Sequence, residues 1–137
     1  LVDTTVEMLA ADPGRSVLAG EIASDPGSLT GRRIAGAAHD GDPVALAAFD
    51  DFARRLGLGL ALVADVYDPE LVVIGGGVSG SAPLFLDAAR EHYAAVTTGA
   101  GHRPLARVRV AQLGDAAGLI GAADLARSAV ETSRPPL

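Results

Sequence analysis

Residues 71–80 of the chain read Leu-Val-Val-Ile-Gly-Gly-Gly-Val-Ser-Gly, an apolar run that ends in three consecutive glycines. A short, unbroken apolar run bounded by turn residues is typical of a strand that is buried on both faces of a parallel sheet. Glycines at the end of such a strand carry no Cβ atom to hold a ligand away from the backbone, and they permit positive φ angles. Ligands of open α/β sheets bind beyond the carboxyl ends of the strands. We therefore expect this glycine loop (residues 75–80) to bind a nucleotide.

A long helix is predicted directly before this strand. Asp42 is a suitable N-cap, Pro43 suits the first helical position, and an Asp-Pro pair at residue 68 ends the helix. Apolar residues at spacings of three and four mark its predicted inner face: Phe49, Phe52, Leu56, Leu60, Val63 and Tyr67. Gly57 and Gly59 each cost the helix about 1 kcal/mol relative to alanine. We therefore expect another backbone to pass close to these two glycines.

The pattern after the glycine loop predicts three further elements: a helix over 82–96 with Ser81 as its cap, a strand over 107–110 and a helix over 116–130. The second strand alternates Arg-Val-Arg-Val, which buries only one face. The order helix, strand, helix, strand, helix implies a parallel crossover and an α/β layer fold.

Short helical patterns over 1–9, 16–23 and 28–38 precede this unit. We accordingly divide the chain into three parts: a helical lead-in (1–41), a helix-strand-helix-strand-helix unit (42–131) and a tail (132–137).

Composition limits the chemistry of the chain. Its 137 residues include no cysteine, and all 11 basic residues are arginine, which excludes disulfides, thiol catalysis and a lysine-bearing phosphate loop. A net charge of −6 argues against nucleic acid as a main partner of this part of the protein. No apolar run approaches the roughly 18 residues of a membrane helix, so we expect no membrane and a cytoplasmic location. The histidines at 39, 92 and 102 match no metal spacing, and no metal site is predicted.

Three segments resemble the ROK (repressor, open reading frame, kinase) family of sugar kinases. Residues 68–79, DPELVVIGGGVS, resemble the family segment that lines the adenosine side of the ATP site. Residues 98–105, TGAGHRPL, resemble the loop before its penultimate strand, and residues 113–126, LGDAAGLIGAADLA, resemble its C-terminal helix. The resemblance covers roughly residues 41–127 and is greatest to the bacterial glucokinases of the family.

The resemblance implies an α/β fold of the actin-like ATPase (ribonuclease H-like) sugar kinase type, with this chain as the C-terminal part of the larger lobe. Such enzymes transfer the γ-phosphoryl group of Mg·ATP to a sugar hydroxyl, which is glucose O6 in the glucokinases. The residues that this places against the adenosine are Gly75, Gly76 and Gly77, with Ser79 as a further candidate. Gly118, Gly121 and Ala122 would let the last helix pack closely against its neighbours near the site.

Other family features are not in this sequence: an Asp-x-Gly-x-Thr phosphate loop, a catalytic aspartate and a cysteine-rich zinc segment. The chain begins at Leu1 rather than at a methionine, and we expect these features upstream of it in the missing N-terminal part of the same protein. The resemblance then implies ATP and Mg²⁺ as cofactors, zinc through the upstream segment, glucose or a related hexose as substrate, and a homodimer. On this interpretation the chain contains no catalytic residue and is inactive alone.

Three other interpretations of the glycine loop stay open. It can be a tight turn without a ligand. It can be a dinucleotide site, because Gly75, Gly77 and Gly80 satisfy G-x-G-x-x-G, although the acidic residue expected roughly 20 residues later at the next strand end is missing. It can also belong to the sugar-sensing body of a ROK-type transcriptional repressor, the one case in which nucleic acid would be a partner. The choice between ATP and polyphosphate as donor, and the hexose used, also stay open.

Overall fold

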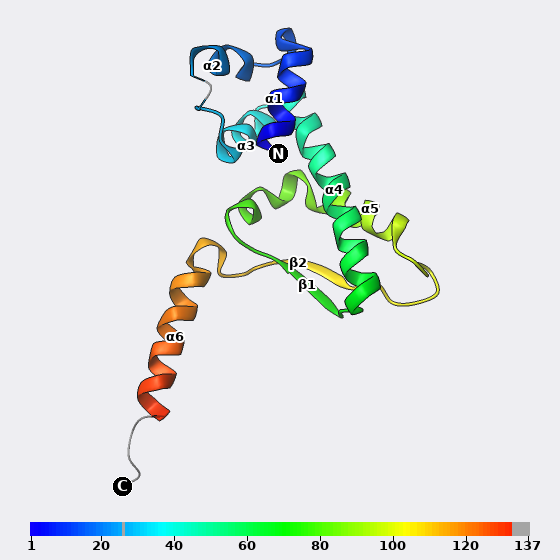
Figure 1. The fold of residues 1–137 in the computed structure, drawn as a ribbon, viewed down its shortest axis with the longest axis vertical. Coiled ribbons are helices and arrows are strands. Elements are labelled where there is room, and N and C mark those ends of the chain that lie inside the picture. The colour runs from blue at the N-terminus through cyan, green and yellow to red at the C-terminus, as the bar shows by residue number, and fades with distance from the viewer. Residues whose placement is uncertain (26, 133–137) are drawn as a thin grey trace.

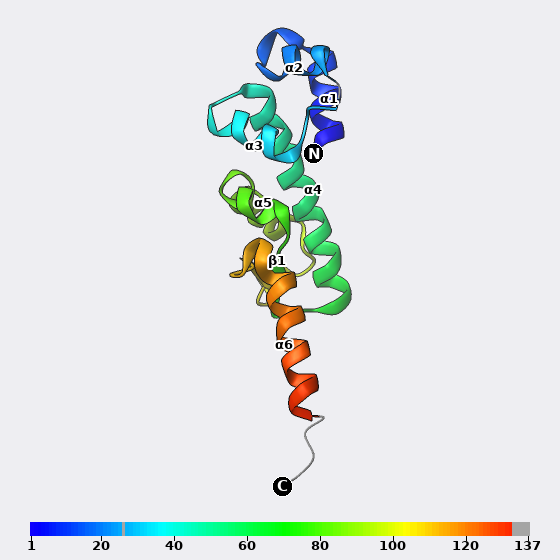
Figure 2. The ribbon, with the colours of Figure 1, turned by 90° about the vertical axis from the view of Figure 1, so that its left-hand side faces the viewer.

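The structure, a computed structural model, describes residues 1–25 and 27–132. Of the predicted tail at 132–137, Thr132 belongs to the last helix, and residues 133–137 lie outside the described residues. The helices and strands are α1 (Val2–Ala11), α2 (Leu18–Ser24), α3 (Gly31–His39), α4 (Pro43–Tyr67), β1 (Leu71–Ile74), α5 (Leu86–Val96), β2 (Arg107–Val110) and α6 (Ala117–Thr132). Short 3₁₀ segments lie at η1 (Pro13–Arg15), η2 (Gly77–Leu84) and η3 (Gly114–Ala116). The molecule is elongated, with α1–α3 clustered at one end, α4 running along the body and α6 at the other end (Figures 1 and 2).

The long helix begins as the sequence predicts. The Asp42 carboxylate accepts hydrogen bonds from the N–H groups of Val44 at 3.0 Å and Ala45 at 2.9 Å, which caps α4. Its second oxygen accepts a bond at 2.9 Å from the N–H of Val17, just before α2. This one buried carboxylate therefore starts α4 and also fixes α2 against it.

The two strands pair in parallel, as predicted, but β1 is not buried on both faces. Val72 lies opposite Val108 on the side that faces the core, whereas Leu71 and Val73 lie opposite arginines on the other side. Leu71 is 45% exposed and Val73 is 55% exposed. The prediction was wrong because, within the described residues, α4 and α5 cover one side of this two-stranded sheet and nothing covers the other.

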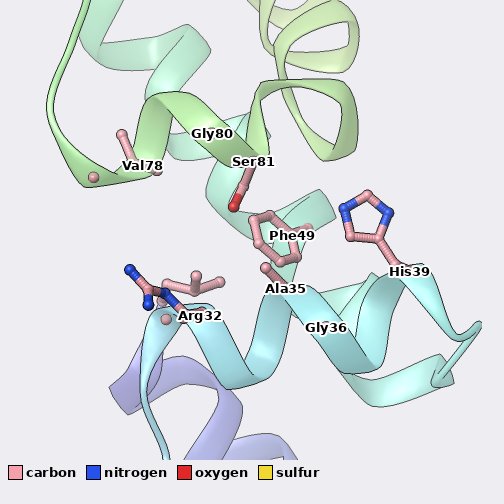
Figure 3. Close-up of a pocket in the computed structure, with 11 residues that line it drawn as sticks. Arg32, Ala35, Gly36, His39, Phe49, Val78, Gly80 and Ser81 are labelled. Atoms are coloured by element: carbon pink, nitrogen blue, oxygen red, sulfur yellow. The ribbon is translucent and has the colours of Figure 1, made fainter. Parts of the chain in front are cut away.

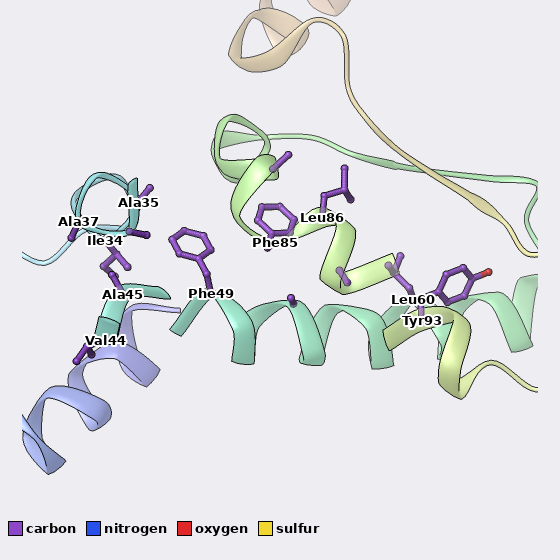
Figure 4. Packing of buried hydrophobic residues seen from close by; sticks show 14 of the residues in the cluster. Ile34, Ala35, Ala37, Val44, Ala45, Phe49, Leu60, Phe85, Leu86 and Tyr93 are labelled. Carbon is purple, nitrogen blue, oxygen red and sulfur yellow. The ribbon is translucent and has the colours of Figure 1, made fainter. Parts of the chain in front are cut away.

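Aromatic rings join the helical cluster to the sheet end of the molecule. Phe49 of α4 and Phe85, which precedes α5, stack with their ring centroids 6.4 Å apart, and Phe52 meets Phe85 edge-on at 5.0 Å (Figure 4). Phe85 is 1% exposed and has an extended φ of −141°, which interrupts the helical path. The predicted helix over 82–96 is confirmed as far as its end at Val96, but its start and its Ser81 cap were wrong. A 3₁₀ segment ends at Leu84, and α5 begins only after Phe85, whose ring is buried in the core.

Helix α5 packs on the small residues of α4. A Cβ atom built on Gly57 would lie 2.5 Å from the Cβ of His92 and 2.9 Å from the carbonyl oxygen of Ala89, so the predicted close backbone approach is confirmed there. It was wrong for Gly59, where such an atom would meet nothing within 4 Å. The predicted inner face was also wrong at its end, because Val63 is 43% exposed and Tyr67 is 77% exposed. The closely packed face instead follows Gly57 and the buried alanines beside it.

Helix α6 projects away from the rest of the molecule (Figure 1). Residues 117–129 are all exposed, and a Cβ atom built on Gly118 or Gly121 would meet no atom within 4 Å. The expectation that Gly118, Gly121 and Ala122 bring this helix close to its neighbours was therefore wrong for the structure. Nothing in the described part of the chain covers α6.

No described helix of the chain is both long and apolar enough to cross a membrane.

Candidate functional site

The glycine loop is a tight turn that holds itself in shape. Gly76 has φ +77° and ψ −171°, a backbone conformation that is essentially restricted to glycine. The N–H and the hydroxyl of Ser79 both donate to the carbonyl oxygen of Gly76, at 3.0 and 2.7 Å. Ser79 is buried beneath the turn. The turn therefore directs its other residues outward, over the N-terminal helices.

A cavity of about 750 Å³ lies between this loop and α3. This volume falls within the range of small-molecule sites. Residues of α3 form one wall and residues of the loop form the other, with Phe49 between them (Figure 3). Leu1 also lines the cavity. The lining residues from α3 are Gly31, Arg32, Ala35, Gly36 and His39, and those from the loop are Gly77, Val78, Gly80 and Ser81.

Both walls of the cavity include bare glycine backbone, above an apolar floor. A Cβ atom built on Gly31, Gly77 or Gly80 would meet nothing within 4 Å, so the peptide groups at these positions are open to a ligand. Ala35 and Phe49 supply the buried apolar surface below them. A flat, largely apolar ligand that can also bond to backbone groups suits such walls.

The polar groups of the cavity come from both walls. Arg32 and His39 reach from α3 at opposite ends of the cavity, and Ser81 points from the loop toward α3 (Figure 3). Arg32 forms no ion pair within the described residues. Its neighbour Arg33 points elsewhere and makes a bidentate ion pair with Glu21 of α2. The side-chain bond from Arg33 lowers the pKa of Glu21 and raises the pKa of the Arg33 guanidinium.

The structure separates the four residues predicted to contact the nucleotide. Gly77 lines the cavity, whereas Gly76 and Ser79 form the turn beside it. Gly75 lies beside the residue that follows β2, since an added Cβ atom would be 3.5 Å from the Cβ of Ala111. Sequence analysis missed the whole contribution of α3, since no pattern linked the glycines at 31 and 36 to a loop so far along the chain.

Other candidates have structural positions. Arg103 donates to Asp65 and Asp68 at 2.7 Å each and to the carbonyl oxygen of Thr98 at 3.0 Å. It therefore fixes its loop to the end of α4, where Asp68 adopts a left-handed conformation with φ +45°. Of the three histidines, His39 lines the cavity, and no group of three or more His, Asp or Glu in the described part of the chain could hold a metal ion.

The surroundings of the glycine loop do not favour the dinucleotide interpretation. That fingerprint opens directly into a helix whose N-terminus holds the pyrophosphate. Here the 3₁₀ segment η2 follows the glycines, and α5 begins only at Leu86. The strand β2 runs into Ala111 and Gln112, which provide no carboxylate for a ribose.

Comparison with known proteins identifies relatives over most of the chain. Residues 4–129 match the ROK family. Glucokinase from Streptomyces coelicolor is 45% identical over 102 residues, which are 74% of this chain and 32% of that enzyme. The crystal structure of a ROK family glucokinase from Streptomyces griseus, in complex with glucose and AMPPNP, superposes with a TM-score of 0.79 at 41% identity, over 93% of this chain and 41% of that one.

Regulators are found among the relatives as well. The xylose repressor of Caldicellulosiruptor bescii is 36% identical over 63 residues, which are 46% of this chain and 16% of the repressor. The chain spans about a third of the length of the S. coelicolor glucokinase that it matches. The family match over residues 4–129, the sequence identities and the shared helix-rich α/β fold lead to one conclusion: the chain belongs to the ROK family.

Proposed function

We propose that this chain supplies the adenosine side of the ATP site of a ROK glucokinase, as the C-terminal part of its larger lobe. The cavity between the glycine loop and α3 carries this proposal. Its bare glycine backbone at Gly77 and Gly80 and its apolar floor at Phe49 suit a purine base. The support from relatives is that the S. griseus glucokinase was crystallised with glucose and AMPPNP.

The reaction that we propose for the complete enzyme is transfer of the γ-phosphoryl group of Mg·ATP to O6 of glucose. Such transfer depends on positioning and electrostatics, with Mg²⁺ neutralising charge on the phosphates. The part that we assign to this chain is the positioning of the donor. The catalytic aspartate and the Mg²⁺ and zinc ligands are assigned to residues outside this sequence. The homodimer and the cytoplasmic location stay predictions.

Direct binding of AMPPNP to the 137-residue chain tests the proposal. We expect isothermal titration calorimetry to show one site for AMPPNP. We also expect no glucose phosphorylation by the chain alone. Absence of AMPPNP binding would refute the nucleotide site, and measurable turnover of glucose would refute the assignment of catalysis to residues elsewhere.

The substitution Gly77→Leu tests whether the cavity is that site. A Cβ atom added at Gly77 meets no atom within 4 Å and Gly77 has no positive φ, so the turn accepts a side chain there, and leucine would occupy space in the cavity. We expect AMPPNP affinity to fall by at least about tenfold. The control is Gly118→Leu on α6, which also enters open space but lies away from the cavity, and its affinity should equal that of the unmodified chain.

A sugar-sensing repressor body is the second candidate, favoured by the identity to the C. bescii xylose repressor. The two candidates differ in their need for a nucleotide, since a regulator need not bind ATP. Binding of xylose or glucose without any binding of AMPPNP would favour the regulator.

A further inference from the structure

Arg32 is a cation without a counter-ion in the wall of the cavity. Its side chain is exposed, and no carboxylate within the described residues pairs with it. Its neighbour Arg33 makes a bidentate ion pair with Glu21 through Nε and Nη2, and most other arginines of the described residues pair with an aspartate. The free guanidinium of Arg32 is therefore available to a ligand in the cavity.

The surroundings of Arg32 favour a planar ring as its ligand over a polyphosphate chain. Val78 of the glycine loop lies opposite Arg32, and the floor of the cavity at Ala35 and Phe49 is apolar (Figure 3). Gly77 also lines the cavity with an open backbone. A guanidinium is planar and weakly hydrated, and it stacks on aromatic rings and nucleobases. A polyphosphate carries a charge on each phosphate and needs a row of cations, whereas the basic side chains in the described lining of this cavity are Arg32 and, at its far end, His39.

We infer that Arg32 clamps the purine base of the donor by stacking its guanidinium on the ring, against the glycine loop on the other side. This inference rests on the proposed nucleotide site. It makes the donor a purine nucleoside triphosphate rather than a polyphosphate, because the contact that it adds is to the base. Arg32 is then a binding residue that sets donor class and takes no part in the transfer of the phosphoryl group.

Titrations with three ligands distinguish a contact of Arg32 with the base from a contact with the phosphates. The probes are adenosine, AMPPNP and inorganic tripolyphosphate, each titrated into the 137-residue chain by calorimetry. We expect Arg32→Ala to lower the affinities for adenosine and for AMPPNP by the same factor, about tenfold. Arg32→Lys keeps the positive charge but loses the planar guanidinium group, so its affinity for both ligands should fall as much as that of Arg32→Ala. Tripolyphosphate should bind neither the unmodified chain nor the variants.

The matched control is Arg33→Ala, which removes an adjacent guanidinium that is paired with Glu21 and does not line the cavity, and which should leave the affinities for adenosine and AMPPNP unchanged. Circular dichroism checks that each variant is folded. If Arg32→Lys restores AMPPNP binding while adenosine binding never changes, Arg32 contacts phosphate and the inference fails. If the unmodified chain binds AMPPNP and Arg32→Ala binds it equally well, the clamp alone is refuted. If the unmodified chain binds neither adenosine nor AMPPNP, the proposed function fails with it.

Discussion

Replacing Gly57 with alanine is expected to lower the free energy of unfolding by about 3 kcal/mol. The new methyl group would lie 2.5 Å from the Cβ of His92 and 2.9 Å from both the carbonyl oxygen of Ala89 and the backbone nitrogen of Tyr93. Two of these three atoms belong to the backbone of α5, which cannot rotate away as a side chain can. The helices must therefore separate, and buried contacts along the whole α4–α5 interface weaken. Urea unfolding followed by tyrosine fluorescence measures the loss.

Gly59 provides the control, since it lies two residues further along the same helix. An alanine there meets nothing within 4 Å, and alanine favours the helix over glycine by about 1 kcal/mol. Gly59→Ala should therefore stabilise the chain slightly. An unfolding free energy for Gly57→Ala close to that of Gly59→Ala would show that α5 does not pack as closely as described.

Replacing Asp42 with alanine is expected to cost about 3 kcal/mol. The carboxylate is 7% exposed and accepts bonds from the backbone N–H groups of Val17, Val44 and Ala45. Its loss leaves all three donors without this acceptor and also frees the start of α2. Asp50→Ala is the control, because it removes an equal charge from an exposed position of the same helix. An equal effect of the two substitutions would show that the loss comes from net charge.

The same carboxylate makes stability depend on pH. Burial alone would raise the pKa of Asp42, but hydrogen bonds from Ala45, Ser16, Val17 and Val44 outweigh it and leave the pKa below its usual value. A lowered pKa stabilises the fold above the unfolded pKa of about 3.9, and this stabilisation disappears as the pH falls through the folded pKa. The difference in unfolding free energy between the unmodified chain and Asp42→Ala should therefore have its largest value near pH 6 and decrease below pH 4. Glu21 and Asp51 also have lowered pKa values, but both proteins carry them, so their effect cancels.

Local chemistry was predictable from the sequence where one short segment determines it. The cap at Asp42, the parallel pairing of the two strands and the close approach at Gly57 are all confirmed. The burial of β1 was not predictable, because an apolar run looks the same whether one or both faces are covered. The prediction that Val63 lies on the inner face of α4 was wrong for a related reason. The close approach of α5 places the small residues of α4, rather than the large apolar ones, at the interface.

The candidate site shows the same division between local and tertiary information. The glycine loop and its positive φ follow from three adjacent glycines, and Gly77 does line the cavity. The opposite wall belongs to α3, whose sequence around Arg32 suggests only a surface helix. The two walls of the cavity lie opposite each other because α3, which directly precedes α4, packs over the glycine loop. That arrangement depends on packing around Phe49 and Phe85, which no motif encodes.

The projecting α6 divides the chain into two parts that need not unfold together. With 16 residues it is near the length at which an isolated helix is only marginally stable in water, and its described residues contact little outside η3. Both tyrosines lie in the body, and Tyr93 is buried there with its hydroxyl accepting a bond from the N–H of Ala106 at 3.0 Å. On heating, tyrosine fluorescence should report one sharp transition, whereas far-ultraviolet circular dichroism should decline gradually first as α6 frays. Fluorescence is therefore the signal from which stabilities of the body should be taken.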